Sequence, residues 1–382
     1  MGRNDLPLDP TRLPDKTPHP GLFRTPLLSF PLRSLLPHGP VVTGLRLVYI
    51  EPRERVRNRS LPLADVPLFQ DLKVFTGNAH PHLAEDICQY LEMPLGECEV
   101  FEFSNENIFV QFEENIRARD VFIVQTMTPP VNTRIMELFI MIDAARRASA
   151  GRITAVVPYY PHSRSDKKDQ PRVPITARLI ANFLETAGAD RLLTVDLHAG
   201  QIQGFFNIPV DELTALSILA GYIKNKRFPN LTVVATDVGG AKGARRMADR
   251  LDAPLAIVEK RRIDNEERVE TLTVIGDVKG RAVLIVDDEV LTGGTLVATA
   301  ETVIEHGATH VYACATHPIL AGSAVERIER APIQELVFTD TIPIPPEKRL
   351  PTMTVLSVAP LLGEAIRRIH TGQSVGALFN GH

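Results

Sequence analysis

The feature that most constrains the fold of this chain is an alternation of short apolar runs with helical patterns, which begins near residue 72. The run Ala-Val-Leu-Ile-Val at 282–286 is rich in β-branched residues and has no polar position, as in a strand buried on both faces. Strands that alternate with helices indicate mainly parallel sheets covered by helices on both sides. The 382 residues suffice for two domains, and two runs of similar length predict two like α/β domains. Strands are expected at 73–78, 120–125, 152–158, 191–198, 231–235, 254–258, 282–286, 310–315 and 335–339, and helices at 82–91, 132–148, 176–187, 214–224, 240–251, 296–305 and 361–370.

The strand at 282–286 leads into the most informative polar stretch of the sequence. Asp287 and Asp288 follow it, and Thr292-Gly293-Gly294-Thr295 then opens a helix. Glycines permit a close backbone approach, so amides and threonine hydroxyls at a helix start can bind a phosphate. Neighbouring carboxylates can accept hydrogen bonds from the hydroxyls of a sugar diol. Two glycines alone would suit an ordinary strand–turn–helix corner, but the combination predicts a site for a phosphorylated ribose.

Other polar residues follow predicted strands, where ligands bind in parallel α/β sheets. They are His198, Asp237, Lys260 and Arg262, and Arg164 lies in a polar loop after another strand. A phosphate site with histidine, acids and cations at one edge indicates metal-assisted phosphoryl chemistry. Taken singly, His198 has a structural alternative, Asp237 could cap a helix, and Lys260–Arg262 could be a solvated charge run. No Gly-x4-Gly-Lys-[Ser/Thr] loop is present, which excludes a P-loop for ATP.

Composition narrows the class of protein. Lys plus Arg number 42 against 46 Asp plus Glu, a net charge of −4 that argues against general nucleic-acid or membrane-surface binding. Three cysteines without metal or disulfide spacing fit a cytoplasmic protein, and no apolar stretch is long enough to span a bilayer. Residues 1–70 are rich in proline without periodicity, so a poorly structured arm is expected there.

From about Leu72 to the C-terminus the chain resembles the ribose-phosphate pyrophosphokinases. The motifs that carry the resemblance are Phe75-Thr-Gly-Asn78, Pro129-Pro-Val-Asn132, Arg172-Val-Pro-Ile-Thr176, Asp196-Leu-His-Ala-Gly-Gln-Ile-Gln-Gly-Phe-Phe206, Asp237-Val-Gly-Gly240, Lys260-Arg-Arg262 and Ser357-Val-Ala-Pro-Leu-Leu362. The resemblance implies transfer of the pyrophosphoryl group of ATP to the anomeric hydroxyl of ribose 5-phosphate, giving phosphoribosyl pyrophosphate and AMP, with Mg²⁺ as cofactor. It implies two phosphoribosyltransferase-like domains, expected at 71–213 on the ATP side and 214–364 on the ribose 5-phosphate side. A helix in 365–382 is expected to return to the first domain, and the chains are expected to form dimers or hexamers.

The resemblance also assigns roles to individual positions. Lys260 and Arg262 would act on the transferring group, and His198 and Asp237 would hold the metal. Asp287 and Asp288 would face the ribose hydroxyls, with Leu291, Thr292, Gly293, Gly294 and Thr295 around the 5-phosphate. The ATP site would be formed by Phe103, Asn105, Glu106, Asn107, Arg164 and Ser165.

Departures from the family pattern at four positions raise an alternative function. Asn105 and Asn107 stand where carboxylates are usual, Ser165 replaces a glutamine, and Leu291 replaces an aspartate before Thr-Gly-Gly-Thr. Leucine cannot accept a hydrogen bond from a sugar hydroxyl. Glu289 either points elsewhere on an extended backbone or is brought round to the pocket by a turn. The alternative is a weak or inactive paralogue that serves as a regulatory or structural subunit beside a related synthetase.

Overall fold

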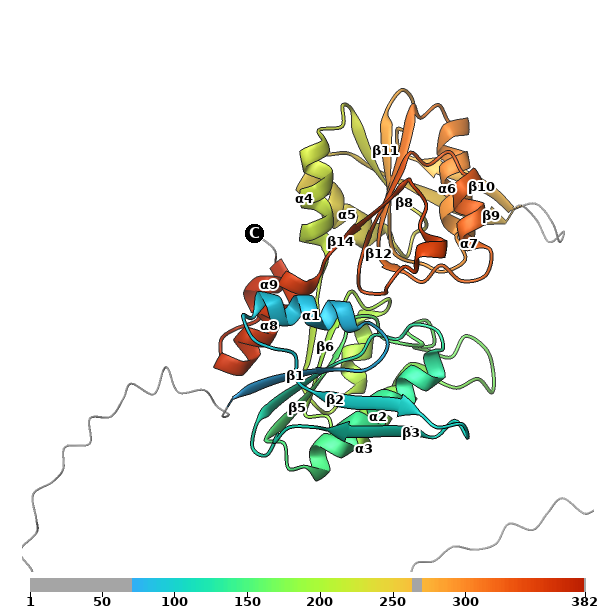
Figure 1. Ribbon diagram of the computed structural model, residues 1–382. Helices are drawn as coiled ribbons and strands as arrows, with labels where there is room; N and C mark the ends of the chain where they lie inside the picture. The colour runs from blue at the N-terminus through green and yellow to red at the C-terminus, as the bar shows by residue number, and fades with distance from the viewer. Residues whose placement is uncertain (1–70, 263–269, 381–382) are drawn as a thin grey trace, which may run out of the picture. The chain divides into compact units, whose positions relative to one another are not determined.

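Two sheets of mainly parallel strands organise the computed structural model, which describes residues 71–262 and 270–380 (Figure 1). These residues belong to one compact unit of the chain, Ser60–His382. The proline-rich arm at 1–70 lies outside the described residues, so the prediction of a poorly structured arm stays a prediction.

The first sheet has five parallel strands in the order β1-β4-β5-β6-β7. The strands are β1 (Leu72–Thr76), β4 (Asp120–Val124), β5 (Arg152–Val157), β6 (Arg191–Val195) and β7 (Val210–Leu213). Because successive side chains of a strand point to opposite faces, Phe75 packs with α2 and α3 while Val74 packs with α1 and α8. These helices are α1 (Pro81–Tyr90), α2 (Val131–Arg147), α3 (Thr176–Ala187) and α8 (Ala359–Thr371), and a 3₁₀ turn, η2 (Gly200–Phe205), follows β6. Helices on both faces explain why β4, β5 and β6 are buried along nearly their whole length.

The second sheet has seven strands in the order β10-β9-β8-β11-β12-β13-β14. They are β8 (Leu231–Ala235), β9 (Leu255–Arg262), β10 (Glu270–Ile275), β11 (Ala282–Val290), β12 (His310–Pro318), β13 (Glu335–Thr339) and β14 (Met353–Leu356), of which β10 runs antiparallel to its neighbour. Leu284 packs against α4 (Leu216–Lys226) and α5 (Ala241–Leu251), and Val283 packs on the other face against α6 (Gly294–Glu305) and α7 (Ala324–Arg330). A 3₁₀ turn, η3 (Pro346–Lys348), precedes β14, and α9 (Gly376–Asn380) follows α8. The predicted α/β class with two sheets is therefore confirmed.

Every strand and helix expected from the sequence is found, but the pattern misses several short elements. These are β7, β10, β14, α7 and an antiparallel hairpin formed by β2 (Cys98–Glu102) and β3 (Ile108–Phe112). The hairpin strand Cys-Glu-Val-Phe-Glu mixes charged with apolar residues, so it lacks the continuous apolar run of a central strand. The hairpin packs on the first core through Phe112, whose ring lies 4.7 Å from that of Phe75.

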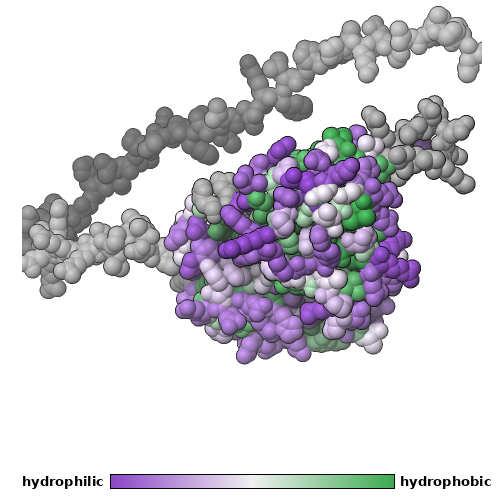
Figure 2. All heavy atoms as spheres, turned by 90° about the horizontal axis from the view of Figure 1, so that it is seen from above, coloured by the Kyte–Doolittle hydropathy of each residue, from purple (hydrophilic) through white to green (hydrophobic). Residues whose placement is uncertain are grey.

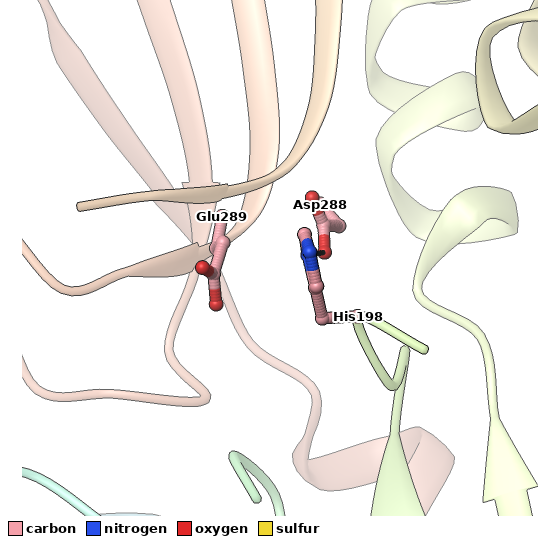
Figure 3. Close-up of side chains that lie close together, drawn as sticks. All are labelled: His198, Asp288 and Glu289. Carbon is pink, nitrogen blue, oxygen red and sulfur yellow. Dashed lines mark hydrogen bonds and ion pairs between the residues drawn. The ribbon is translucent and has the colours of Figure 1, made fainter. Parts of the chain in front are cut away.

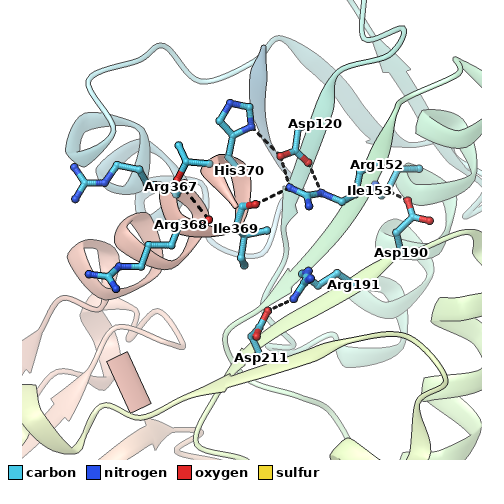
Figure 4. Close-up of polar contacts among 11 residues, drawn as sticks. Asp120, Arg152, Ile153, Asp190, Arg191, Asp211, Arg367, Arg368, Ile369 and His370 are labelled. Atoms are coloured by element: carbon cyan, nitrogen blue, oxygen red, sulfur yellow. Dashed lines mark hydrogen bonds and ion pairs between the residues drawn. The ribbon is translucent and has the colours of Figure 1, made fainter. Parts of the chain in front are cut away.

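The helix near the C-terminus, α8, packs beside α1 in the core of the first sheet (Figure 1). A buried polar contact joins the end of α8 to this sheet (Figure 4). The Asp120 carboxylate, with no exposed surface, accepts from Arg152 Nε at 2.8 Å and lies 2.9 Å from Nδ1 of His370. Arg152 also donates to the carbonyl of Ile369 at 3.1 Å. The helix α8 is thus bound to the first sheet, although it follows the strands of the second sheet in the sequence.

Direct hydrogen bonds join the loops of the two sheets. Thr126 Oγ1 donates to the carbonyl of Thr341 at 2.6 Å, and Thr316 Oγ1 donates to the Asp196 carboxylate at 2.8 Å. His317 Nε2 lies 3.0 Å from the carbonyl of Asp196. All of these residues follow strands or lie at strand ends, so the carboxyl edges of the two sheets face a common region.

Hydrophilic residues cover most of the face shown in Figure 2, with apolar residues scattered between them. Among residues 71–262 and 270–380, no helix combines the length and the apolar character that crossing a membrane requires.

Candidate active site

A cavity of about 600 Å³ lies where the carboxyl ends of strands from both sheets meet. Asp196 and His198 line it from the loop after β6, and Asp287 and Asp288 line it from β11. Asp237, which follows β8, lines it as well. Parallel packing brings strand ends to one edge, so residues far apart in sequence converge on one pocket.

His198, which follows β6, and Asp288 of β11 are in direct polar contact in this cavity (Figure 3). His198 Nδ1 lies 2.6 Å from an Asp288 oxygen. The hydrogen bond to Asp288 raises the pKa of His198, and burial opposes that shift. Although burial alone would raise the pKa of Asp288, hydrogen bonds from His198 and Asp287 lower it to about 2. The pair is therefore most stable as an imidazolium facing a carboxylate.

Asp287 lies beside this pair, and its pKa is shifted in the opposite direction from that of Asp288. Burial and the neighbouring charge of Asp288 raise the pKa of Asp287 from 3.8 to about 8. Thr236 Oγ1 donates to its carboxylate at 3.2 Å, and its other oxygen accepts from the Asp288 amide at 3.0 Å. Two adjacent carboxyl groups thus differ in protonation, because only one of them lies against a cationic partner.

Asp287→Asn is expected to remove a pH dependence of stability when a chelator keeps divalent ions away. The pKa of Asp287 is higher in the folded protein than in the unfolded chain. Its protonated carboxyl group therefore contributes fully to stability below about pH 4, and this contribution is lost as the pH rises to about 8. The variant should gain about 0.5–2 kcal/mol in unfolding free energy over the wild type near neutral to alkaline pH, and less under acidic conditions. Urea unfolding at acidic and alkaline pH measures the difference, and parallel profiles for the two proteins would contradict the expectation.

His198 and Asp237, the residues assigned to a metal, line the same cavity. Asp237 accepts from the Gly240 amide at 2.7 Å, but Gly240 is itself the N-cap residue of α5, so Asp237 does not cap the helix. Among the described residues, the histidine and acids whose ligand atoms lie within 4.8 Å of one another are His198, Asp288 and Glu289. Carboxylate oxygens suit a hard cation such as Mg²⁺, and the cavity offers several of them.

Glu289 does not turn towards the Thr-Gly-Gly-Thr segment. β11 stays extended through Val290, and the Glu289 carboxylate accepts hydrogen bonds from the Tyr159 hydroxyl at 3.2 Å and from Arg164 Nε. Both donors belong to the loop after β5. The first alternative drawn from the sequence, a side chain that points elsewhere, is therefore correct.

The Thr-Gly-Gly-Thr segment forms the turn between β11 and α6. Gly293 has φ +73°, and a Cβ there would meet the Ala324 carbonyl at 3.4 Å, so a side chain would be strained. Leu291 is half-buried, and its carbonyl accepts from the Ala321 amide at 2.7 Å. Arg327 donates to the Thr292 carbonyl at 3.5 Å, which places a cation beside the turn.

The residues assigned to ATP are split between two places. Phe103 to Asn107 form the exposed tip of the β2–β3 hairpin, outside the cavity lining, where the Asn105 side chain accepts from the Asn107 amide at 3.2 Å. Phe103 packs against Phe101 with ring centroids 4.8 Å apart. Arg164 lies next to Glu289, and Ser165 Oγ accepts from the Thr176 amide at 3.2 Å at the start of α3.

The side chains of Lys260 and Arg262 lie outside the description, but their backbone belongs to β9. Ile257 of β9 and Val286 of β11 both pair with Ala235 of β8, so Lys260 lies on the same sheet edge as Asp287. Beyond Ile257, β9 pairs with β10 alone and extends past the end of β8.

Sequence reasoning missed two cations that line the cavity. Lys242 and Arg246 lie one turn apart on α5, directly after the Asp237-Val-Gly-Gly240 motif. Basic residues four positions apart on a helix share a face, and that spacing beside a glycine pair was the available signal. They offset part of the negative charge of the acids in the cavity.

Comparison with known proteins identifies the family. A family model described as the N-terminal domain of ribose phosphate pyrophosphokinase matches residues 72–188, and one described as the phosphoribosyl synthetase-associated domain matches residues 263–380. The ribose-phosphate pyrophosphokinase of Caldanaerobacter subterraneus subsp. tengcongensis is 50% identical over 309 residues, which are 81% of this chain and 98% of that protein. That of Bacillus subtilis is 47% identical over 311 residues, again 81% of this chain and 98% of the relative.

A solved structure agrees with these relatives. The crystal structure of phosphoribosylpyrophosphate synthetase from Mycobacterium smegmatis is 42% identical, has a TM-score of 0.75, and covers 78% of this chain and 99% of its own. Together, the two matched regions and the relatives that align over nearly their full length show that this chain is a member of the ribose-phosphate pyrophosphokinase family of enzymes.

Proposed function

We propose that the protein transfers the pyrophosphoryl group of ATP to ribose 5-phosphate and releases AMP. The anomeric hydroxyl oxygen attacks the β-phosphorus, the bond from that phosphorus to the bridging oxygen of AMP breaks, and the hydroxyl proton is released. The observation that carries the proposal is the single cavity shared by His198, Asp237, Asp287 and Asp288, at the edge from which the Thr-Gly-Gly-Thr turn and β9 extend.

The residues that line the cavity and those around it have separate roles in this proposal. The turn at 292–295 binds the 5-phosphate through its amides and hydroxyls. Asp287 and Asp288 accept hydrogen bonds from the ribose hydroxyls, and Lys260 and Arg262 neutralise the transferring group. Phe103 to Asn107, Arg164 and Ser165 bind ATP. Such a displacement needs positioning and charge neutralisation more than covalent catalysis, and these residues supply both.

Mg²⁺ is the proposed cofactor, held by His198 and Asp237 with the acids of β11 close by. When bound, the metal neutralises phosphate oxygens of ATP. We place the enzyme in the cytoplasm, as a dimer or hexamer or in a complex with a related synthetase.

A catalytically weak regulatory subunit is the second candidate function. Leu291 favours it, since no carboxylate takes its place at the turn once Glu289 is bound to Tyr159 and Arg164. Purified protein with Mg·ATP and ribose 5-phosphate, assayed for AMP alone and again with an authentic synthetase, separates the two. AMP release by the chain alone supports the enzyme, and release only on addition of the synthetase supports the subunit.

Leu291→Asp is expected to raise AMP release by about tenfold. The new carboxylate can accept one hydrogen bond from a ribose hydroxyl, worth about 1–1.5 kcal/mol. Leu179→Asp, on an exposed part of α3, adds the same charge away from the cavity and should leave the rate unchanged. Equal rates for Leu291→Asp and wild type would show that the departure at this position is not limiting.

A further inference from the structure

Glu289 is a buried acid that the reaction proposed above does not use. Its side chain is 1% exposed and belongs to β11 of the second sheet, whereas both of its hydrogen-bond donors come from the loop after β5 of the first sheet. A buried carboxylate near other acids is costly unless it is paired and hydrogen-bonded. Glu289 meets both conditions by binding Tyr159 with one oxygen and Arg164 with the other.

The hydrogen-bond pattern does not favour Glu289 as a metal ligand, although it lies within 4.8 Å of His198 and Asp288 (Figure 3). Each carboxylate oxygen already accepts from a donor. The Tyr159 donor is itself held in place, because its ring lies 4.9 Å from that of His317 and its amide donates to Thr126 at 3.3 Å. Burial and the charge of Glu289 raise the pKa of Tyr159, so the hydroxyl keeps its proton.

The geometry of Arg164 shows which of its N–H donors Glu289 does not bind. Glu289 binds Nε, on one edge of the guanidinium group, whose five N–H donors lie in a rigid plane. Among the described residues, no hydrogen bond from either Nη atom of Arg164 is found, and its side chain is 55% exposed. The charges of Asp287 and Asp288 act on this guanidinium as well, which places it close to the candidate active site.

We propose that Glu289 is a positioning residue that binds the Nε edge of Arg164 and thereby presents its Nη edge to the triphosphate of ATP. This inference rests on the proposed function, in which Arg164 binds ATP. Glu289 also compensates for the altered nucleotide site of this chain, because a fixed guanidinium loses less conformational freedom on binding. Arg164 cannot leave Glu289 without leaving a buried carboxylate with only a neutral donor, so the contact orients the arginine and is not released on binding.

Steady-state kinetics of Glu289→Gln in the full-length protein tests the proposal. Glutamine keeps the shape and an oxygen acceptor but removes the charge that holds the arginine. The KM for ATP should rise by about 10-fold or more, while the KM for ribose 5-phosphate stays within about twofold. Asp211→Asn is the matched control, since it breaks a part-buried pair with Arg191 on β7 and β6 and should leave both constants unchanged.

A double-mutant cycle shows whether Glu289 acts through Arg164. Glu289→Gln should cause little further loss of ATP affinity when Arg164 is already alanine, because the residue it positions is gone. Fully additive losses, or an unchanged KM for ATP in the single variant, would overturn the proposal. Circular dichroism and urea unfolding of each variant establish that a loss of affinity is not a loss of fold.

Titration calorimetry with Mg·ATP separates this proposal from the proposed function. If the wild type releases no AMP, the reaction is refuted, but calorimetry of wild type and Glu289→Gln still compares their affinities for ATP. Weaker binding by the variant supports the positioning role. Equal binding, or no binding by either protein, refutes it.

Discussion

Lys260→Ala is expected to lower kcat by about 10²–10³-fold, the usual cost of losing one group that stabilises charge in the transition state. The KM values for ATP and ribose 5-phosphate should change much less, because the residue acts on charge that develops during transfer. The β-register supports this role: β9 extends past the end of β8 and carries Lys260 along the sheet edge where Asp287 lies.

Lys279→Ala is the control for this experiment. Lys279 is an exposed lysine in the turn between β10 and β11, at the opposite edge of the same sheet, and its loss should leave kcat unchanged. Rapid-quench measurement of AMP in a single turnover isolates the chemical step from product release. A loss confined to KM, or no loss, would show that Lys260 does not act on the transferring group.

Asp120→Ala is expected to destabilise the protein by about 3–5 kcal/mol. This is the usual cost of removing one partner of a buried ion pair, here the pair of Asp120 with Arg152. The substitution leaves Arg152 and His370 without the carboxylate that both contact, at the junction of β4, β5 and the end of α8 (Figure 4). Unfolding in urea measures the loss, and hydrogen exchange should show that α8 opens first, since Arg152 also binds the Ile369 carbonyl.

Asp143→Ala is the matched control for the buried pair. Asp143 pairs with Arg147 one turn along α2, and both side chains are well exposed to solvent. Exposed pairs of this kind contribute little, so the midpoint of unfolding should not move. An equally small effect of Asp120→Ala would mean that packing of α8 against α1, not the ionic contact, holds the last long helix in place.

Most of the fold was predictable because its central strands are buried on both faces. Ala-Val-Leu-Ile-Val at 282–286 has no polar position, and β4 is apolar after its first residue, Asp120, a pattern typical of parallel sheets. The edge strands were missed for the same reason. β2 and β10 carry charged and polar residues beside apolar ones, which local pattern cannot distinguish from a loop.

Some residues of the candidate site could be predicted from the sequence and others could not. His198, Asp237, Asp287 and Asp288 could be assigned to one region because each lies near or just after the carboxyl end of a strand in a mainly parallel sheet. The direction of the Glu289 side chain could not be predicted, since it depends on whether β11 stays extended for one more residue. Lys242 and Arg246 were missed because a basic face on a helix is usually exposed to solvent.

The sequence by itself determined the α/β class, the strand ends that carry the candidate site residues and the membership in this family. It did so because these properties depend on local pattern and on the order of motifs along the chain. Only the tertiary structure decided that His198 faces Asp288, that Glu289 binds Arg164 and that Arg152 binds the Ile369 carbonyl. Each of these contacts joins residues at least 90 positions apart, and their approach depends on how whole sheets pack and not on any nearby residue.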